Sequence, residues 1–379
     1  MITRLLKPVT SQSFFLFGPR GTGKTTWVKF NYPNSIYLDL LDSSLFTRLL
    51  ADPSRLTSYI PPGNKEYVVL DEVQRVPELL NEVHRLIESE KIKFILTGSS
   101  ARKLRSKGHN LLAGRALTYF MHPLTALELR TSFNLKHAIQ FGLLPSATKE
   151  ADPSKYLSSY VATYLEQEIS QEGLTRNLSA FSRFLETASF SQGSIINMSA
   201  IARDSSVERK VVENYFSILQ DLLIGYKLPP FTKRAKRRLM SQPKFYFFDT
   251  GVYRSIRPAG PLDAPEEIGG IALETLFFQN LLAINQSLGL NYDLYYYRTA
   301  TGIEVDFIAY GEKGIIAFEV KHSSKFSESM LKGLKHFLQD YPKSKAYLLY
   351  MGDKVLYQDN ITVLPIKNAL ETLDKILVS

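Results

Sequence analysis

Residues 14–30 read FFLFGPRGTGKTTWVKF, and this stretch decides the fold of the N-terminal part of the chain. An apolar run comes first, followed by a glycine-rich loop and then by a segment that suits the start of a helix. Gly18, Gly23, Lys24 and Thr25 satisfy the pattern G-x-x-x-x-G-K-[ST]. The backbone N–H groups of such a loop, together with the helix N-terminus, cradle phosphates. Its position between an expected strand and an expected helix predicts a P-loop that binds ATP.

The other residues of a nucleotide site follow two further expected strands. In EYVVLDEVQRVPEL (66–79), a buried strand ends at Asp71 and Glu72. Asp71 suits an acid that holds Mg²⁺, and Glu72 suits a catalytic base that orients the attacking water. The hydroxyl residues of KIKFILTGSSARKL (91–104) lie where a polar sensor of the γ-phosphate is expected. The predicted nucleotide-binding set, with Thr25 and Asp71 as Mg²⁺ ligands, is Gly18, Pro19, Arg20, Gly21, Thr22, Gly23, Lys24, Thr25, Thr26, Asp71 and Ser99.

Arg115 is a further candidate for catalysis. It lies in LLAGRALTYF (111–120), after the expected sensor strand and before another strand. An arginine in such a place can act in trans on the γ-phosphate of a neighbouring subunit, which requires an oligomer. A solvent-facing arginine, or one paired with a carboxylate, explains the same pattern.

The order of these segments resembles a family of prokaryotic AAA-type ATPases with a C-terminal region known as DUF4143. The resemblance rests on GPRGTGKTT, VVLDEVQRVP, FILTGSS, LAGR and HPLTALEL in this order, and on KFYFFDTGVYRSI (244–256) further along the chain. It covers most of the chain and implies an AAA+ core that hydrolyses ATP with Mg²⁺. It indicates the fold better than the biological role.

Length and composition limit the possibilities for the rest of the chain. A chain of 379 residues is too long for one ordinary core and is expected to form several domains. The net charge of +9 favours a polyanionic partner such as DNA. Because there is no cysteine, and no unbroken apolar run of about 18 residues, we expect a cytoplasmic protein without a membrane span.

The pattern of apolar residues divides the chain into four expected domains, so the predicted fold class is a multidomain α/β protein. Its parts are the AAA+ core (1–130), a helical lid (131–192), a winged-helix domain (193–256) and an α/β domain (257–379). The winged helix is predicted from a short helix, a turn and a longer helix in sequence. Residues 257–270, rich in proline and glycine, are expected to form a linker.

Basic residues of the third domain suggest contact with DNA. Arg209 and Lys210 lie near the start of the expected recognition helix. The run TKRAKRRL (232–239) suits sequence-independent contacts with phosphates. The predicted nucleic-acid set is Arg209, Lys210, Lys233, Arg234, Lys236, Arg237 and Arg238. A winged helix used for packing or oligomerisation, with the basic run as a solvated wing tip, is the alternative.

The stretch GIEVDFIAYGEKGIIAFEVK (302–321) places four charged residues inside the two apolar strands of a hairpin. If the turn is centred on GEKG, Asp306 lies opposite Glu319, and Glu304 lies opposite Lys321. Like charges that face each other destabilise a sheet, so we expect a compensating cation, either Lys321 or a divalent metal. The apolar residues expected together on the other face are Val305, Phe307, Phe318 and Val320.

These charges, with Glu274 on the preceding helix, resemble the motif of the PD-(D/E)XK nuclease superfamily, although Val305 stands where its name has proline. The resemblance implies that Glu274, Asp306 and Glu319 bind Mg²⁺ or Mn²⁺ and that Lys321 acts on the hydrolytic water. Carboxylates at this separation suit such a metal on chemical grounds as well. A local ion-pair network in an inactive scaffold is the alternative.

Two functions are consistent with these patterns. The first is an oligomeric ATPase, such as a hexameric ring, that remodels or translocates DNA and carries a metal-dependent nuclease-like domain acting on branched or junction DNA. The second is a nucleotide-dependent regulatory or scaffold ATPase with an inactive nuclease-like domain. Stimulation of the ATPase by DNA and Mn²⁺-dependent cleavage distinguish the two.

Overall fold

The computed structural model of the chain describes residues 2–100, 102, 104, 112, 114–165, 169, 177–233, 241–261 and 263–378. These residues form two compact units, each with hydrophobic cores of its own. The smaller unit consists of Leu6–His122 with Asp221–Leu223, and the larger unit contains the rest. Residues 131–192, predicted to be a lid, therefore belong to the larger unit.

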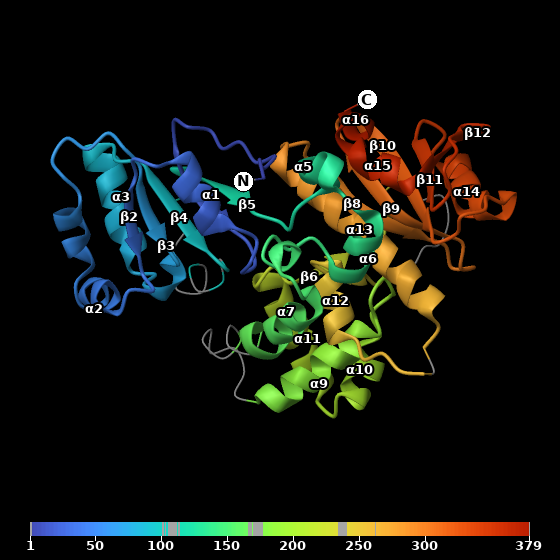
Figure 1. The fold of residues 1–379 in the computed structure, drawn as a ribbon, viewed down its shortest axis with the longest axis horizontal. Helices are drawn as coiled ribbons and strands as arrows, with labels where there is room; N and C mark the ends of the chain where they lie inside the picture. The colour runs from blue at the N-terminus through green and yellow to red at the C-terminus, as the bar shows by residue number, and fades with distance from the viewer. Residues whose placement is uncertain are drawn as a thin grey trace. The chain divides into compact units, whose positions relative to one another are not determined.

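The smaller unit is built on a parallel five-stranded sheet with helices beside it, coloured blue to cyan in Figure 1. The strand order is β2-β3-β4-β1-β5, and every neighbouring pair is parallel. The three central strands are buried along their whole length, as a sheet covered on both faces requires. The elements are β1 Ser13–Phe17, α1 Lys24–Asn31, β2 Ile36–Asp39, α2 Ser43–Ala51, η1 Pro53–Tyr59, β3 Val68–Asp71, η2 Val73–Arg75, α3 Leu79–Glu90, β4 Phe94–Gly98 and β5 Ala116–Phe120.

The loop from β1 to α1 requires glycine at two positions. Gly23, the N-cap of α1, has a φ of 89°, a conformation that glycine adopts without steric cost. At Gly18 a Cβ atom would lie 2.3 Å from the carbonyl oxygen of Met121. The loop therefore passes close to the end of β5, and a side chain at position 18 has no room.

The first part of the larger unit is mostly helical. Helices α9 and α11 pack through aromatic rings, with Phe181 and Phe184 centred 4.8 and 5.1 Å from Tyr215. Helices α10 and α11 lie where the short and the long helix are predicted. The elements are α5 Ala126–Leu129, η3 Arg130–Ser132, α6 Leu135–Phe141, η4 Ala147–Lys149, α7 Pro153–Ser159, the π-helical turn η5 Tyr160–Leu165, α9 Leu178–Ser189, α10 Met198–Asp204, α11 Arg209–Asp221, the antiparallel pair β6 Gly225–Leu228 and β7 Lys244–Phe247, and α12 Thr250–Ile256.

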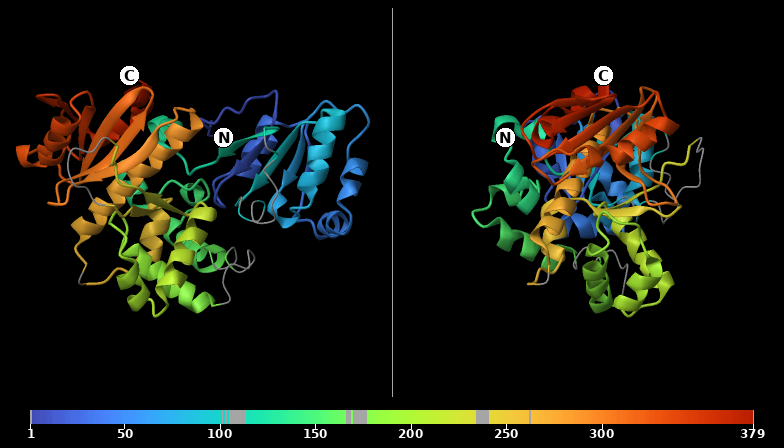
Figure 2. Two further views of the ribbon diagram at one scale, coloured as in Figure 1. Left: turned by 180° about the vertical axis from the view of Figure 1, so that it is seen from behind. Right: turned by 90° about the vertical axis from the view of Figure 1, so that its right-hand side faces the viewer.

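The C-terminal part of this unit is a mixed six-stranded sheet in the order β12-β13-β11-β10-β9-β8, coloured orange to red in Figures 1 and 2. Strands β8, β9 and β10 are antiparallel, and α14 connects β10 to the parallel strand β11. This gives the order helix, three strands, helix, strand. The elements are α13 Pro265–Ser287, β8 Asp293–Arg298, β9 Glu304–Gly311, β10 Gly314–Lys321, η6 Glu328–Leu331, α14 Lys332–Asp340, β11 Lys345–Tyr350, β12 Leu356–Gln358, β13 Ile361–Pro365, α15 Ile366–Glu371 and α16 Leu373–Val378.

The expected linker at 257–270 is wrong in its second half, because α13 begins at Pro265. Proline in the first turn, with Glu266 and Glu267 beside it, favours a helix N-terminus. Gly269 lies inside the helix. A Cβ at this position would lie 3.0 Å from the His322 ring, so the close packing favours glycine here. Among the described helices, α13 alone is long and apolar enough to cross a membrane, but most of its apolar stretch is buried within the unit.

The hairpin of β9 and β10 has the predicted register up to Phe307, which pairs with Phe318. Beyond that point β9 contains a bulge, because Asp306 and Phe307 together face one residue of β8 between the pairs Tyr295–Ile308 and Tyr297–Val305. A bulge turns the following side chains to the opposite faces. Val305 accordingly packs with Ile308 and Phe337, not with Phe307 and Phe318 as predicted.

Helix α14 approaches β9 closely at this bulge. A Cβ at Gly333 would lie 2.0 Å from the carbonyl oxygen of Glu304, so Gly333→Ala forces helix and strand apart. We expect the variant to lose about 1–3 kcal/mol of unfolding free energy in urea denaturation, as for other overpacked sites. Gly270→Ala is the control, since its Cβ would meet only His322 Cβ at 3.7 Å. Equal stability of both variants would contradict this packing.

Candidate functional site

The carboxyl ends of β1, β3 and β4 meet at one edge of the parallel sheet, where the glycine-rich loop, Asp71 and Thr97 come together. Asp71 is 3% exposed, and its carboxylate accepts a hydrogen bond from the Thr25 hydroxyl at 3.0 Å. The hydroxyls of Thr97 and Tyr37 also donate to it. The sequence predictions did not include Tyr37, which comes from β2. Burial and its hydrogen bond to Asp71 raise the pKa of the Tyr37 phenol well above its usual range.

The side chain of Lys24, the first residue of α1, folds back onto the glycine-rich loop. The Lys24 ammonium donates to the carbonyl oxygens of Gly18 at 2.5 Å and Pro19 at 3.2 Å. The Thr22 hydroxyl closes the loop by donating to Pro19 at 2.7 Å. A loop of backbone N–H groups, a lysine, a hydroxyl and a carboxylate is the donor set that a nucleotide with Mg²⁺ requires. These residues therefore fit the cofactor pair that the sequence predicts.

The predicted base, Glu72, lies next to this centre in an uncommon backbone conformation, with φ 60° and ψ 45°. Its backbone N–H donates to the Thr97 hydroxyl at 3.3 Å. Its carboxylate accepts from the side-chain amide of Gln74, which also donates to Ser99. The amide of Gln74 thus connects the predicted sensor Ser99 to the predicted base Glu72. Gln74 was not predicted, because an amide carries no motif or charge signal.

Arg115 lies at the opposite edge of the sheet. It immediately precedes β5, whose first residue pairs with Ser13 at the start of β1. Five strand residues, or about 16 Å at 3.3 Å per residue, separate it from the loop edge. Its guanidinium pairs with Glu88. Arg115 therefore cannot reach a nucleotide bound by its own subunit, and a role in trans stays a prediction.

The larger unit contains a second charged centre, where a buried lysine lies among carboxylates. Lys244, on β7, is 2% exposed. Its ammonium lies 3.6 Å from Glu274 Oε1 and 3.9 Å from Asp306 Oδ1, and it contacts Glu304. The phenol of Tyr246 donates to Glu274 as well. Lys321, one of the two expected cations, pairs with Glu319. The cation beside Glu274, Glu304 and Asp306 is a second lysine from a preceding strand, which the sequence predictions did not include.

The pKa values in this centre follow from burial and charge. Burial disfavours the Lys244 ammonium, but the carboxylates around it outweigh this and raise its pKa. Burial raises the pKa of Glu274, against the attraction of Lys244. Burial and repulsion from Asp306 raise the pKa of Glu319, although Lys321 opposes the shift. Burial is thus the main cause of the raised pKa values of Glu274 and Glu319, and the two lysines oppose it.

The metal role predicted for Glu274, Asp306 and Glu319 stays a prediction. Among the described residues, no three acidic or histidine side chains are arranged to hold a metal ion. Asp306 Oδ2 accepts from the backbone N–H of Val320 at 2.8 Å, and Lys244 lies beside its other oxygen. Glu319 has one oxygen paired with Lys321 at 2.5 Å.

The predicted pairing of Glu304 with Lys321 is absent. Glu304 instead binds Arg298 at 2.8 Å and contacts Lys244. The bulge explains the difference, because it turns Glu304 away from the face on which Lys321 lies.

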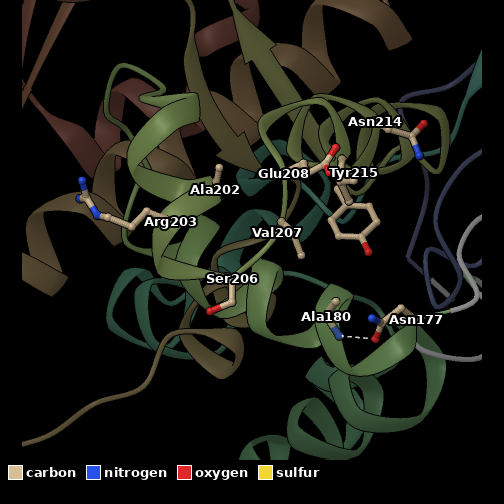
Figure 3. Close-up of a pocket in the computed structure, with 10 residues that line it drawn as sticks. Asn177, Ala180, Ala202, Arg203, Ser206, Val207, Glu208, Asn214 and Tyr215 are labelled. Carbon is tan, nitrogen blue, oxygen red and sulfur yellow. Dashed lines mark hydrogen bonds between the residues drawn. The ribbon is translucent and has the colours of Figure 1, made fainter.

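Two of the predicted DNA-binding residues, Arg209 and Lys210, are exposed at the start of α11. Arg209 pairs with Glu213 one turn further along, at 3.1 Å. A groove of about 880 Å³ lies beside this helix end (Figure 3). Lys233 is engaged within the unit, 3.4 Å from Asp293 and above the Tyr310 ring. The predicted residues outside the described part of the chain are Arg234, Lys236, Arg237 and Arg238.

We expect Lys244→Met to destabilise the larger unit by about 3–5 kcal/mol, because it leaves buried carboxylates without their cation. Unpaired buried acids have folded-state pKa values above their unfolded values, so the folded state binds the extra protons and its stability falls as pH rises. The deficit relative to wild type should therefore be larger at pH 8 than at pH 5 in urea denaturation. Lys227→Met is the control, since that ammonium lies over the Phe216 ring. A deficit independent of pH would contradict the assignment.

Three family models match successive parts of the chain. A model described as AAA domain matches residues 10–130, one described as domain of unknown function DUF8612 matches 132–263, and one described as domain of unknown function DUF4143 matches 269–369. An uncharacterised protein of Mycobacterium tuberculosis is 26% identical over 372 residues, covering 94% of this chain and 80% of the relative. One from Haemophilus influenzae is 23% identical over 307 residues, covering 74% and 72%.

Solved structures resemble the chain only distantly. The Aeropyrum pernix ORC1 protein in complex with DNA has a TM-score of 0.27 at 15% identity, covering 66% of this chain and 86% of that one. A signal transduction ATPase with a tetratricopeptide repeat sensor from Pyrococcus horikoshii has a TM-score of 0.22 at 15% identity, covering 76% and 50%. The sequence models confirm the predicted resemblance. Residues 10–130 match the AAA-domain model and residues 269–369 match the DUF4143 model, in the order that the resemblance implies.

Proposed function

We propose that this chain hydrolyses ATP as a homo-oligomer and couples hydrolysis to the binding of DNA. The observation that carries the proposal is the meeting of Lys24, Thr25, Asp71 and Glu72 at one edge of the parallel sheet. Lys24 suits phosphate binding, Thr25 and Asp71 suit metal binding, and Glu72 suits activation of water. A binding module without hydrolysis has no need for Glu72 in this place.

In the proposed reaction, Lys24 leaves the loop carbonyls and binds the β- and γ-phosphates. Thr25 and Asp71 would hold Mg²⁺, whose charge would offset that of the phosphates. Glu72 accepts a proton from the attacking water, and Ser99 contacts the γ-phosphate. Arg115 lies at the far edge of its own sheet and pairs with Glu88, so a role for it at the γ-phosphate requires a neighbouring subunit, as in a ring.

Charge supports the proposal that DNA is the partner. The chain carries a net charge of +9, and its densest basic run, 232–239, follows β6. Two exposed basic residues begin α11, the second helix of a helix-turn-helix order typical of winged helices. We infer that these residues contact phosphates without reading sequence.

For the C-terminal domain we propose a nuclease-like fold that holds DNA or a partner without cutting it. The order helix, three strands, helix, strand supports the likeness, as do Asp306, Glu319 and Lys321 on neighbouring strands. Lys244 argues against cleavage, because an ammonium group lies among the carboxylates that a metal would need. A Mg²⁺- or Mn²⁺-dependent nuclease is the second candidate, supported by the free acceptor at Glu319, one of whose oxygens has no hydrogen-bond partner in the described chain.

Glu72→Gln should retain ATP binding but lose about 10²-fold or more in kcat, because it removes the general base. Lys24→Ala should lose ATP binding itself. Lys65→Ala, an exposed lysine of the same unit, is the control and should behave as wild type. Phosphate release and nucleotide titration measure these effects. Full activity in Glu72→Gln would refute the assigned base.

DNA should stimulate ATP hydrolysis at low salt, and the stimulation should fall steeply as salt rises. With Mn²⁺, wild type and Asp306→Ala should both leave linear and branched DNA uncut. Cleavage by wild type that disappears in Asp306→Ala would establish the second candidate instead. An ATPase rate that ignores DNA at every salt concentration would remove DNA from the proposal and favour a regulatory or scaffold role.

A further inference from the structure

Gln74 is a buried polar residue beside the predicted base that no motif assigns to a role. It lies on the short turn η2, two residues after Glu72, and is 5% exposed. Its amide nitrogen is 2.5 Å from Glu72 Oε2 and 3.1 Å from the Ser99 hydroxyl. One amide group therefore joins the end of β3 to the residue that follows β4.

The Gln74 amide packs closely against the backbone of Gly98. A Cβ at Gly98 would lie 2.4 Å from the Gln74 amide oxygen, so position 98 must be glycine while Gln74 keeps its place. That oxygen has no hydrogen-bond partner among the residues described. A buried acceptor left unpaired is unfavourable, so packing and the donor contacts hold the amide here.

The backbone of Glu72 is fixed independently of its side chain. Its left-handed conformation is uncommon for a residue other than glycine. The hydrogen bond from its N–H to Thr97 and the one from Arg75 N–H to its carbonyl, at 3.0 Å, hold that conformation. The side-chain torsions of Glu72 are not fixed by these backbone hydrogen bonds. The contact between its carboxylate and Gln74 restrains them.

We propose that Gln74 is a positioning residue for ATP hydrolysis. Its amide binds one carboxylate oxygen of Glu72, which leaves the other for the attacking water, and it ties the base to Ser99. A neutral amide suits this position, because it donates to the carboxylate and takes up no proton at neutral pH. The orientation of the base then depends on what Ser99 contacts. The inference rests on the proposed hydrolysis of ATP.

Steady-state kinetics of the full chain test the inference. Gln74→Ala should lower kcat by about tenfold or more, with KM for ATP and ATP affinity near wild type, because a misplaced base slows only the chemical step. Gln140→Ala, an exposed glutamine of the larger unit, should leave both parameters unchanged.

Gln74→Met supplies a second readout that separates packing from positioning. Methionine fills a similar volume but cannot donate to Glu72 or Ser99. A positioning role predicts the same loss of kcat at unchanged KM as in Gln74→Ala, whereas a merely structural role predicts kcat near wild type. Because this variant conserves volume, it decides the question if Gln74→Ala does not fold.

The outcomes separate this inference from the function on which it rests. A wild-type chain that does not hydrolyse ATP overturns both. An active wild type with an unchanged or increased kcat in Gln74→Ala overturns the inference alone. So does a kcat near wild type in Gln74→Met.

Discussion

The carboxylate of Asp71 is the point on which the predicted nucleotide site depends. It lies at the end of β3 and accepts hydrogen bonds from Thr25 on α1, Tyr37 on β2 and Thr97 on β4. Four elements of the sheet edge are thus joined through one buried group. Hydrogen bonds to a charged acceptor are stronger than those between neutral groups. The position of the predicted metal ligand is therefore fixed by the fold and does not depend on a flexible loop.

The larger unit contains a second group of buried carboxylates, and these are stabilised in a different way. Its carboxylates also gather at strand ends beside a helix, but the positive charge among them comes from Lys244 of the chain itself. Removing one partner of a buried ion pair is strongly destabilising, so a lysine in this place contributes to the fold whatever the domain binds. The two acidic centres of the molecule consequently suit different roles. One offers a hydroxyl and a carboxylate that suit a metal, and the other already contains a lysine among its carboxylates.

Local sequence patterns predicted much of this structure, because the features concerned are set by neighbouring residues. The glycine-rich loop, the strand ending at Asp71 and the pairing of Phe307 with Phe318 each follow from short-range geometry. The bulge in β9 was missed, because it depends on the pairing with β8. Lys244 was missed because it reaches its carboxylates from another strand.

Two further errors have a different physical origin. The start of α13 was placed too late, since glycines that usually indicate a loop here allow a helix to pack against His322. Gln74 and Tyr37 carry no charge, so no expectation about acids, bases or metals pointed to them. Their importance follows only from the hydrogen bonds that they form in the folded chain, Gln74 with Glu72 and Tyr37 with Asp71.

The most direct test of the account asks which of the two acidic centres binds the metal. Electron paramagnetic resonance of Mn²⁺, titrated with a slowly hydrolysed ATP analogue, reports metal bound by the protein. The account predicts a nucleotide-dependent Mn²⁺ signal in wild type that is lost in Asp71→Asn and kept in Asp306→Asn. A signal that persists in Asp71→Asn, or one that disappears in Asp306→Asn, would contradict it.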